Sequence, residues 1–491
     1  MAPSADASFH PTFATEPCPA DVADKLVLQA TCGYLTVLED RSKPTGRTAR
    51  IFVVRIDPPG GTTTPDPILV LGALGNVDDY GSKANAGQRT HRVEYLVDLR
   101  GLGHSEPALD CPEVEAASPG LVGLRLSDPD RTAILQRAVH ACHDRLAQQG
   151  IDLAAYGIDN AAADLEDLRV ALGIHQWNLL SLGSDSRVAY SLVSEHPGTI
   201  RSSIVDSPTL PHPSFEEVAP TATDAALARL VALCAKEAAC HREHPNLHAE
   251  VRRAVARLQA HPWAGDVNGT IASIRLGRPI HVVIDGAALV RWIRFKLGTA
   301  GGTVIGAIPA TVQTILAGRL AATSGIAVDL ASDTNDCLGT LAVCETVVAG
   351  AVYSELCSQE GPLNAFTLYG GELNQLTDLH LFRPLPELRA CQTWGVSSPP
   401  ATPSGSLARG VPTLVFHGSL DPYSAPLSAV RAADPGDPTL FTVEVPNQAY
   451  NTLGYDECPR AIRNAWIDNP TSLPSDTSCI AAMPAPTLEA P

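Results

Sequence analysis

A short segment in the first half of the chain combines hydroxyl side chains with a tight turn. The sequence WNLLSLGSDSRVAYSLVSEHP begins with an apolar run, turns through small residues and continues with helical spacing, which predicts a strand, a turn and a helix. A turn of the pattern G-x-S-x-G lifts a serine hydroxyl into a pocket, where it can act as a nucleophile. The five turn positions here are Ser181, Leu182, Gly183, Ser184 and Asp185. Glycine therefore stands where the nucleophile is expected.

The composition argues against several classes of partner. The 491 residues carry a formal net charge of −18, which argues against a nucleic-acid or anionic-membrane partner. No stretch approaches the roughly 20 apolar residues that a membrane span needs. The N-terminal sequence MAPSADASFHPTFATEPCPAD has neither a basic start nor an apolar segment, so no signal peptide is visible. We therefore expect a cytoplasmic protein without a membrane partner.

The twelve cysteines stand against that expectation. Cys234 and Cys240, and likewise Cys458 and Cys479, have spacings that suit local disulfides, yet disulfides are rare in reducing cytosol. No C-x-x-C occurs, and Cys240 with the nearby histidines lacks a second ligand pair, so we expect no metal site. The main expectation is buried thiols with a few bridges.

Alternation of strand and helix patterns indicates the fold class. Strand patterns cover 26–58, 67–76, 93–107 and 201–208, and helical periods cover 130–150 and 158–173. Strands that alternate with helices favour a parallel sheet with both faces covered.

The pattern changes in the middle of the chain and then returns. From about 214 the periods are helical, until the Pro- and Ser-rich stretch VSSPPATPSGS. The segments VPTLVFHGSLDP and PTLFTVEVPNQAY then read as strands again. We predict an N-terminal extension over 1–25, a core in two parts over 26–213 and 396–491, and a helical cap over 214–395.

Three motifs resemble one known family. VDLRGLGHSEP resembles the D-x-R-G-x-G-x-S turn of the α/β-hydrolases at Asp98, Arg100, Gly101, Gly103 and Ser105. VFHGSLDPYSAP resembles their acid loop and VPNQAYNTLGYDECPRAI their histidine loop. From about residue 18 to 479 the chain resembles the branch of tripeptidyl aminopeptidases and proline iminopeptidases. The resemblance implies the α/β-hydrolase fold: a mostly parallel central sheet flanked by helices, with a large helical cap insertion.

The resemblance also implies where the catalytic triad should lie. The family's nucleophile position falls on Gly183, its histidine position on Tyr450 and its acid on Asp421. A triad needs the serine to attack, the histidine to take its proton and the aspartate to orient the imidazole. Glycine cannot attack, and a tyrosine with an ordinary pKa near 10 is a poor base at neutral pH. We therefore predict that the serine and histidine of the triad are replaced.

Other residues are candidates for the same site. A proton-transferring Tyr450 held by Asp421 is one interpretation, and a structural cap is an equally open interpretation of Asp421. Ser184, one residue beyond the nucleophile position, could serve as a substitute nucleophile. Arg100 is expected to be a structural anchor, and His417 a packed strand histidine rather than a base. The predicted substrate-binding residues are Gly72, Ala73 and Leu74 of the oxyanion loop, Ser184, Trp292 and Glu345. Glu345 matches a cap glutamate that recognises a substrate amine in the family, or is a solvated helix residue. Trp292 forms a chamber wall or the cap core.

These expectations lead to three functional hypotheses. The first is a repurposed enzyme that cyclises, eliminates from or isomerises a small, largely apolar molecule in the former acyl pocket. The second is a non-catalytic protein that binds a ligand or partner. The third is a residual hydrolase or peptidase that uses another nucleophile. None of them requires a cofactor or a metal.

Overall fold

A nine-stranded sheet organises the chain. The computed structural model describes residues 9–25, 30–58, 60–61, 64–72, 90–125, 128–211, 215–269, 271–298, 302–319, 349–360, 391, 393–396, 407–486 and 488. The strand order is β1-β2-β3-β5-β4-β6-β7-β10-β11. The strands are β1 (Thr12–Glu16), β2 (Ala30–Leu38), β3 (Thr48–Ile56), β4 (Ile68–Leu71), β5 (Glu94–Val97), β6 (Trp177–Leu182), β7 (Ile200–Asp206), β10 (Thr413–Gly418) and β11 (Leu440–Val445).

The sheet has an antiparallel part and a parallel part. The strands β1, β2 and β3 are antiparallel, and β3 also pairs antiparallel with β5. From β5 to β11 every pairing is parallel. Because the parallel strands reverse their order at β5-β4-β6, their carboxyl ends meet around a topological switch point, where open α/β sheets bind ligands. This topology confirms the expected α/β-hydrolase fold. The segment predicted as an N-terminal extension contributes β1 to the sheet.

Alternate residues of the strands face two separate cores. In β3, Ile51 and Val53 belong to one apolar cluster, whereas Phe52 and Val54 belong to the other. The first cluster is covered by α3 (Pro112–Val122), α4 (Pro129–Gln148), α5 (Ile158–Ala171), α6 (Ser186–Glu195) and α14 (Ala349–Glu360). The second is covered mainly by α19 (Glu457–Asp468). The helices predicted over 130–150 and 158–173 are confirmed as α4 and α5.

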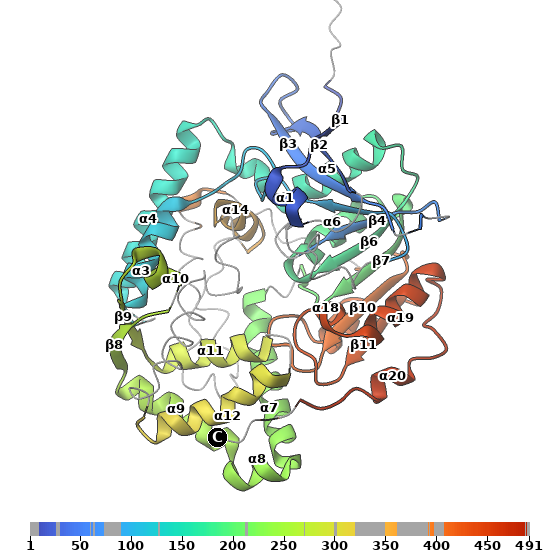
Figure 1. Ribbon diagram of the computed structural model, residues 1–491. Coiled ribbons are helices and arrows are strands. Elements are labelled where there is room, and N and C mark those ends of the chain that lie inside the picture. The colour runs from blue at the N-terminus through green and yellow to red at the C-terminus, as the bar shows by residue number, and fades with distance from the viewer. Residues whose placement is uncertain are drawn as a thin grey trace, which may run out of the picture.

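A mostly helical insertion separates β7 from β10. It includes α7 (Phe215–Lys236), α8 (Ala238–Glu243), α9 (Leu247–Ala260), α10 (Ile271–Leu276), α11 (Gly286–Gly298) and α12 (Gly302–Leu316). Figure 1 shows most of these helices grouped apart from the sheet, at the lower left. They share a third apolar cluster. The insertion also holds a hairpin of β8 (Trp263–Val267) and β9 (Ile280–Ile284), which the sequence analysis did not predict.

Short helices complete the part of the chain that the structure describes. They are α1 (Ala20–Lys25), η2 (Leu153–Tyr156), η3 (Gly183–Asp185), η4 (Pro197–Thr199), α17 (Leu427–Ala433), α18 (Thr452–Tyr455) and α20 (Ser478–Ala481).

The turn after β5 is a structural junction. The Arg100 guanidinium donates to both carboxylate oxygens of Asp164 (2.7 and 2.6 Å) and to the carbonyl oxygens of Glu39 and Ala155 (3.0 and 2.6 Å). Its side chain is almost completely buried. The Ser105 hydroxyl donates to the Asp98 carbonyl (2.6 Å). These contacts agree with the expectation that Arg100 is a structural anchor.

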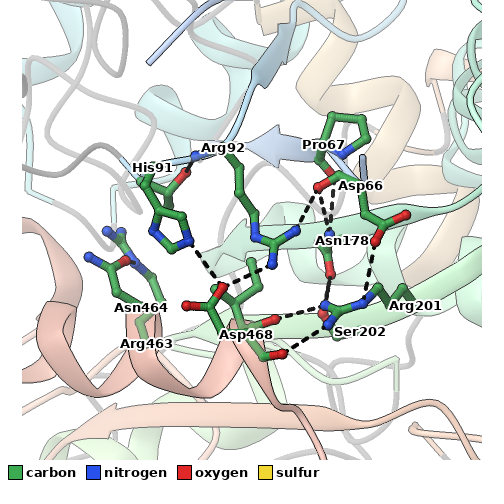
Figure 2. A network of polar contacts seen from close by, with 12 residues as sticks. Asp66, Pro67, His91, Arg92, Asn178, Arg201, Ser202, Arg463, Asn464 and Asp468 are labelled. Carbon is green, nitrogen blue, oxygen red and sulfur yellow. Dashed lines mark hydrogen bonds and ion pairs between the residues drawn. The ribbon is translucent and has the colours of Figure 1, made fainter. Parts of the chain in front are cut away.

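A polar network ties α19 to the amino ends of the central strands (Figure 2). Arg201 donates to the Ile467 carbonyl (2.7 Å) and to Asn178 (2.8 Å), whose amide in turn bonds the Asp66 carbonyl (3.1 Å). Arg92 donates to the Asp468 carboxylate (2.9 Å). The network lies at the opposite end of the strands from the turn at Gly183, so it fixes the sheet without entering that region.

All ten cysteines within the described residues are joined in disulfides. The pairs are Cys18–Cys32, Cys111–Cys142, Cys234–Cys240, Cys357–Cys391 and Cys458–Cys479. The two local pairs suggested by spacing are therefore present. The expectation of mainly free thiols is wrong for the described residues, because no free cysteine occurs among them. The other two cysteines lie outside the described residues.

Candidate active site

Gly183 occupies the turn between β6 and α6. Its φ of +59° is a left-handed conformation that glycine adopts without strain and that a β-branched or bulky residue strongly disfavours. The Ser186 hydroxyl donates to the Gly183 carbonyl (2.6 Å) and accepts from the Thr209 N–H (2.9 Å). The strand and the helix are thus held at a fixed, sharp angle, with Gly183 at the apex.

The Tyr450 ring lies directly above Gly183. A Cβ added to Gly183 would lie 2.9 Å from Tyr450 Cζ, and the hydroxyl oxygen would be closer still. Real Cβ atoms essentially never approach heavy atoms under 3.0 Å, so the phenol fills the space that a side chain at position 183 would need. The structure therefore brings together the two residues that the sequence aligned with the nucleophile and histidine positions.

The end of β7 holds the loop that carries Tyr450. The Asn451 N–H donates to the Ser207 hydroxyl (3.0 Å), and the Leu453 N–H donates to the Asp206 carboxylate (2.7 Å). The Thr452 hydroxyl donates to the same carboxylate (3.0 Å). Burial raises the pKa of Asp206 to about 6, although these hydrogen bonds oppose the shift. Asp206 therefore positions the loop rather than serving as an exposed acid.

Asp421 is bonded within its own loop. One carboxylate oxygen accepts from the N–H groups of Tyr423 (2.8 Å) and Ser424 (3.2 Å), and the other accepts from the Ser424 hydroxyl (2.5 Å). Among the described residues, no hydrogen bond joins Asp421 to Tyr450. Its effect on Tyr450 is electrostatic, acting through the negative charge of the carboxylate.

The surroundings of Tyr450 keep its phenol protonated. Burial raises the pKa of Tyr450 well above its usual 10, and the charges of Asp421, Asp185 and Asp206 raise it further. All three carboxylates are at least 97% buried. A phenol in this setting donates a hydrogen bond, and it is a weaker proton acceptor than an ordinary tyrosinate or an imidazole.

Two other groups near the turn bear on nucleophilic chemistry. The Ser184 hydroxyl oxygen is buried and has no hydrogen-bond partner within the described part of the chain. His417, on β10, is 8% exposed, and its Nε2 is likewise without a described partner. Burial lowers the pKa of His417, against the opposing effect of Asp421 and Glu444. The imidazole is therefore neutral near pH 7.

The helical insertion reaches the site through Tyr423. The Tyr423 ring meets the Tyr450 ring edge-on, with centroids 5.9 Å apart and planes at 89°. The Arg294 guanidinium of α11 lies 4.8 Å from the Tyr423 centroid. A Cβ on Gly298, at the end of α11, would lie 2.6 Å from Tyr423 Cδ2, so glycine permits this close approach. Packing thus connects α11 to Gly183 through two tyrosines.

The other predicted site residues do not all lie near Gly183 and Tyr450. Gly72 follows β4 at the carboxyl edge of the sheet and is partly exposed, as is Ser184. Trp292 is completely buried in the apolar cluster of the insertion. Ala73, Leu74 and Glu345 lie outside the described residues.

Four residues of this region were not predicted from the sequence. Asp206 and Ser207 stand at the end of a predicted strand, and Tyr423 and Ser424 follow the predicted acid loop. Their position in the sequence could have indicated them, because all four lie at or just after the carboxyl ends of parallel strands. Within the described ranges, no group of three or more His, Cys, Asp or Glu side chains could hold a metal ion. No described helix is long and apolar enough to span a membrane.

Comparison with curated proteins gives relatives that match part of the chain. The tripeptidyl aminopeptidase of Streptomyces coelicolor is 28% identical over 203 residues, which cover 39% of this chain and 37% of that protein. The serine protease Hip1 of Mycobacterium tuberculosis is 26% identical over 203 residues, covering 37% of this chain and 36% of Hip1. The match thus spans little more than a third of these relatives' length. No protein-family model matches the chain.

Solved structures give low-identity matches that cover most of the chain. A proline iminopeptidase-related protein from Thermus thermophilus is 14% identical and covers 90% of this chain and 98% of that chain, with a TM-score of 0.38. The proline iminopeptidase of Mycobacterium smegmatis is 13% identical and covers 86% and 96%, with a TM-score of 0.37. At these scores the strand order, rather than the superposition, carries the fold assignment. The chain has the α/β-hydrolase fold and is similar over part of its length to tripeptidyl aminopeptidases and Hip1.

Proposed function

We propose that the chain is an α/β-hydrolase-fold protein without a working Ser-His-Asp triad, and that its former acyl pocket transforms a small, largely apolar molecule without hydrolysis. The observation that carries the proposal is the placement of the Tyr450 phenol over Gly183. A nucleophilic side chain at position 183 would collide with that phenol. A serine triad needs a hydroxyl at this position and an imidazole beside it.

The proposed reaction is a cyclisation, an elimination or an isomerisation. These reactions need a shaped, water-poor site and a positioned proton donor or acceptor, and they need no covalent acyl intermediate. Tyr450 is proposed to donate a hydrogen bond to the reacting group, because its surroundings keep the phenol protonated. Asp421 contributes through its charge, while its hydrogen bonds keep the Tyr423–Ser424 turn in place.

Residual hydrolysis is the second candidate, and the names of the relatives favour it. Tripeptidyl aminopeptidase and serine protease Hip1 are both named for hydrolysis of peptides. Ser184 would be the nucleophile in this case. Against it stands the Ser184 hydroxyl, which has no hydrogen-bond partner among the described residues, because a serine is activated as a nucleophile when a base accepts its proton.

Ester and peptide turnover separates the two candidates. We expect the wild-type chain to hydrolyse p-nitrophenyl acetate and alanyl-alanyl-prolyl p-nitroanilide at the same rate as the Ser184→Ala variant, near the rate in buffer. A wild-type rate that falls at least tenfold in Ser184→Ala would instead establish Ser184 as a nucleophile. A ligand that binds and is returned unchanged would favour a non-catalytic binding protein.

We further propose that the chain folds in an oxidising compartment. Five disulfides support this proposal, because such bonds persist outside the reducing cytosol. This proposal is tested by isolating the protein without reductant and mapping its disulfide-linked peptides. Recovery of these cysteines as free thiols from the native source would restore the cytoplasmic alternative.

A further inference from the structure

We propose that the Tyr450 hydroxyl is a fixed hydrogen-bond donor and that the site above Gly183 binds a neutral ligand through a carbonyl or ether oxygen. This inference rests on the proposed function, because it concerns the same site. It adds the chemical class of the group that enters the site. It does not depend on whether the bound molecule is then transformed.

The Tyr450 hydroxyl is available to a ligand. It makes no hydrogen bond to any residue that the structure describes. Part of the surface of Tyr450, Ser184, Tyr423 and Gly72 remains accessible. A small molecule can therefore reach the hydroxyl from the carboxyl edge of the sheet, where these four residues lie.

The carboxylates of Asp421 and Asp206 accept hydrogen bonds from other groups and not from the Tyr450 hydroxyl. Asp421 accepts from Ser424 and from backbone N–H groups, and Asp206 accepts from Thr452 and Leu453. Their charges nevertheless keep the phenol protonated, as described above. The same charges repel a carboxylate or phosphate ligand. The accessible partner for the hydroxyl is therefore an uncharged acceptor.

Packing fixes the position of the Tyr450 ring and of its hydroxyl oxygen. The Tyr423 ring lies edge-on against the Tyr450 ring, and Gly183 lies beneath it without a Cβ. Hydrogen bonds hold the backbone on both sides of Tyr450. The Leu420 N–H donates to the Gln448 carbonyl (2.9 Å), and the Asn451 N–H donates to the Ser207 hydroxyl (3.0 Å). A donor that is already oriented loses little conformational freedom when it binds, which favours a directional hydrogen bond to a ligand.

Matched pairs of neutral ketones and hydrocarbons test the inference. The probes are acetophenone with ethylbenzene and 2-acetylnaphthalene with 2-ethylnaphthalene, which have similar shapes and differ in the carbonyl oxygen. Affinities are measured for the wild type, for Tyr450→Phe and for Tyr95→Phe. Tyr95 is the matched control, because it packs on Trp177 at the other end of the strands (ring centroids 5.3 Å apart).

We expect Tyr450→Phe to weaken ketone binding by about 3- to 10-fold, the range for one net hydrogen bond, and to leave hydrocarbon binding unchanged. Tyr95→Phe should change neither affinity. The infrared carbonyl band of ¹³C-labelled ketone should move to lower wavenumber on the wild type and return toward its unbonded position on Tyr450→Phe. This band reports the hydrogen bond itself, which a purely structural effect of the substitution does not reproduce.

Three outcomes overturn the inference. They are equal ketone affinity in wild type and Tyr450→Phe, absence of ketone binding, and tighter binding of 1-(2-naphthyl)ethylammonium than of either ketone. The last would mean that the buried carboxylates select a cation. The proposed function fails by a different result, the labelling or turnover at Ser184, so the two failures are distinguishable.

Discussion

Tyr450 and Gly183 form a complementary pair in which the phenol occupies the space that a side chain on the glycine would fill. Tyr450 Cζ lies 2.9 Å from the position of such a Cβ, with the hydroxyl oxygen nearer. The positive φ of Gly183 retains the sharp turn from strand to helix. The turn is therefore retained while its apex carries no side chain.

The pair predicts a strong coupling between the two positions. Gly183→Ala should cost about 2–5 kcal/mol of unfolding free energy, because left-handed strain adds to overpacking against the phenol. In a Tyr450→Ala background only the strain of about 1–2 kcal/mol should remain. Gly173→Ala is the control, since Gly173 has a φ of +65° and nothing within 4 Å of its added Cβ. Equal costs of Gly183→Ala in both backgrounds, measured by urea denaturation, would refute the pairing.

The contact between α11 and Tyr423 predicts a second steric effect. Gly298→Ala should destabilise the protein by about 1–3 kcal/mol, because the new methyl group meets the Tyr423 ring. Hydrogen exchange should rise in the loop 419–424 as this contact loosens. Gly120→Ala, in an open position on α3, should be neutral or slightly stabilising. Unchanged exchange in 419–424 would show that α11 does not support this loop.

The buried Arg100–Asp164 pair predicts a large loss of stability. Asp164→Asn should cost about 3–5 kcal/mol, because it leaves a buried guanidinium without its counter-charge. Asp57→Asn removes the exposed pair with Arg55 and should change stability little. Comparable denaturation midpoints for the two variants would contradict the anchoring role of Arg100.

His104 predicts a loss of stability at alkaline pH. Hydrogen bonds to Asp98 and Asp21, which outweigh burial, raise the pKa of His104 to about 9. Its unfolded value is about 6.5, so its contribution to stability is complete below that pH and is lost as the pH rises through about 9. The urea midpoint should fall over this window. Asp21→Asn should shift the fall to lower pH, whereas Asp24→Asn should not. An identical pH profile for His104→Gln and wild type would refute the assignment.

Sequence patterns could predict the framework better than the details of the site. Continuous apolar runs such as ILVL and WNLLSL predict strands that are buried on both faces, and β4 and β6 have that position. The β8–β9 hairpin was missed because its strands are short and only partly buried. The fold decides which cysteines come close enough to form disulfides. The spacing of cysteines in the sequence cannot predict the pairing of residues as distant as Cys357 and Cys391.

The sequence indicated which loops carry the candidate site, but the contacts between them required the structure. Motif order placed Gly183 and Tyr450 in corresponding loops, and their contact follows from the topology. The structure agrees with one of the two interpretations of Asp421, a cap of its own turn, but nothing in the sequence indicated that Asp206 holds the Tyr450 loop. The Asp206 contacts join two segments that are distant in the sequence, and the pattern of apolar residues does not show such hydrogen bonds.

Covalent labelling with a fluorophosphonate is the most direct test of the claim that the turn at Gly183 carries no working serine nucleophile. Such reagents phosphonylate activated serine hydroxyls and spare unactivated ones. After treatment that fully labels a working serine hydrolase in parallel, the intact mass of the wild-type chain should remain unchanged, because the Ser184 hydroxyl has no described partner to accept its proton. A stoichiometric adduct that maps to Ser184 and disappears in Ser184→Ala would contradict the account.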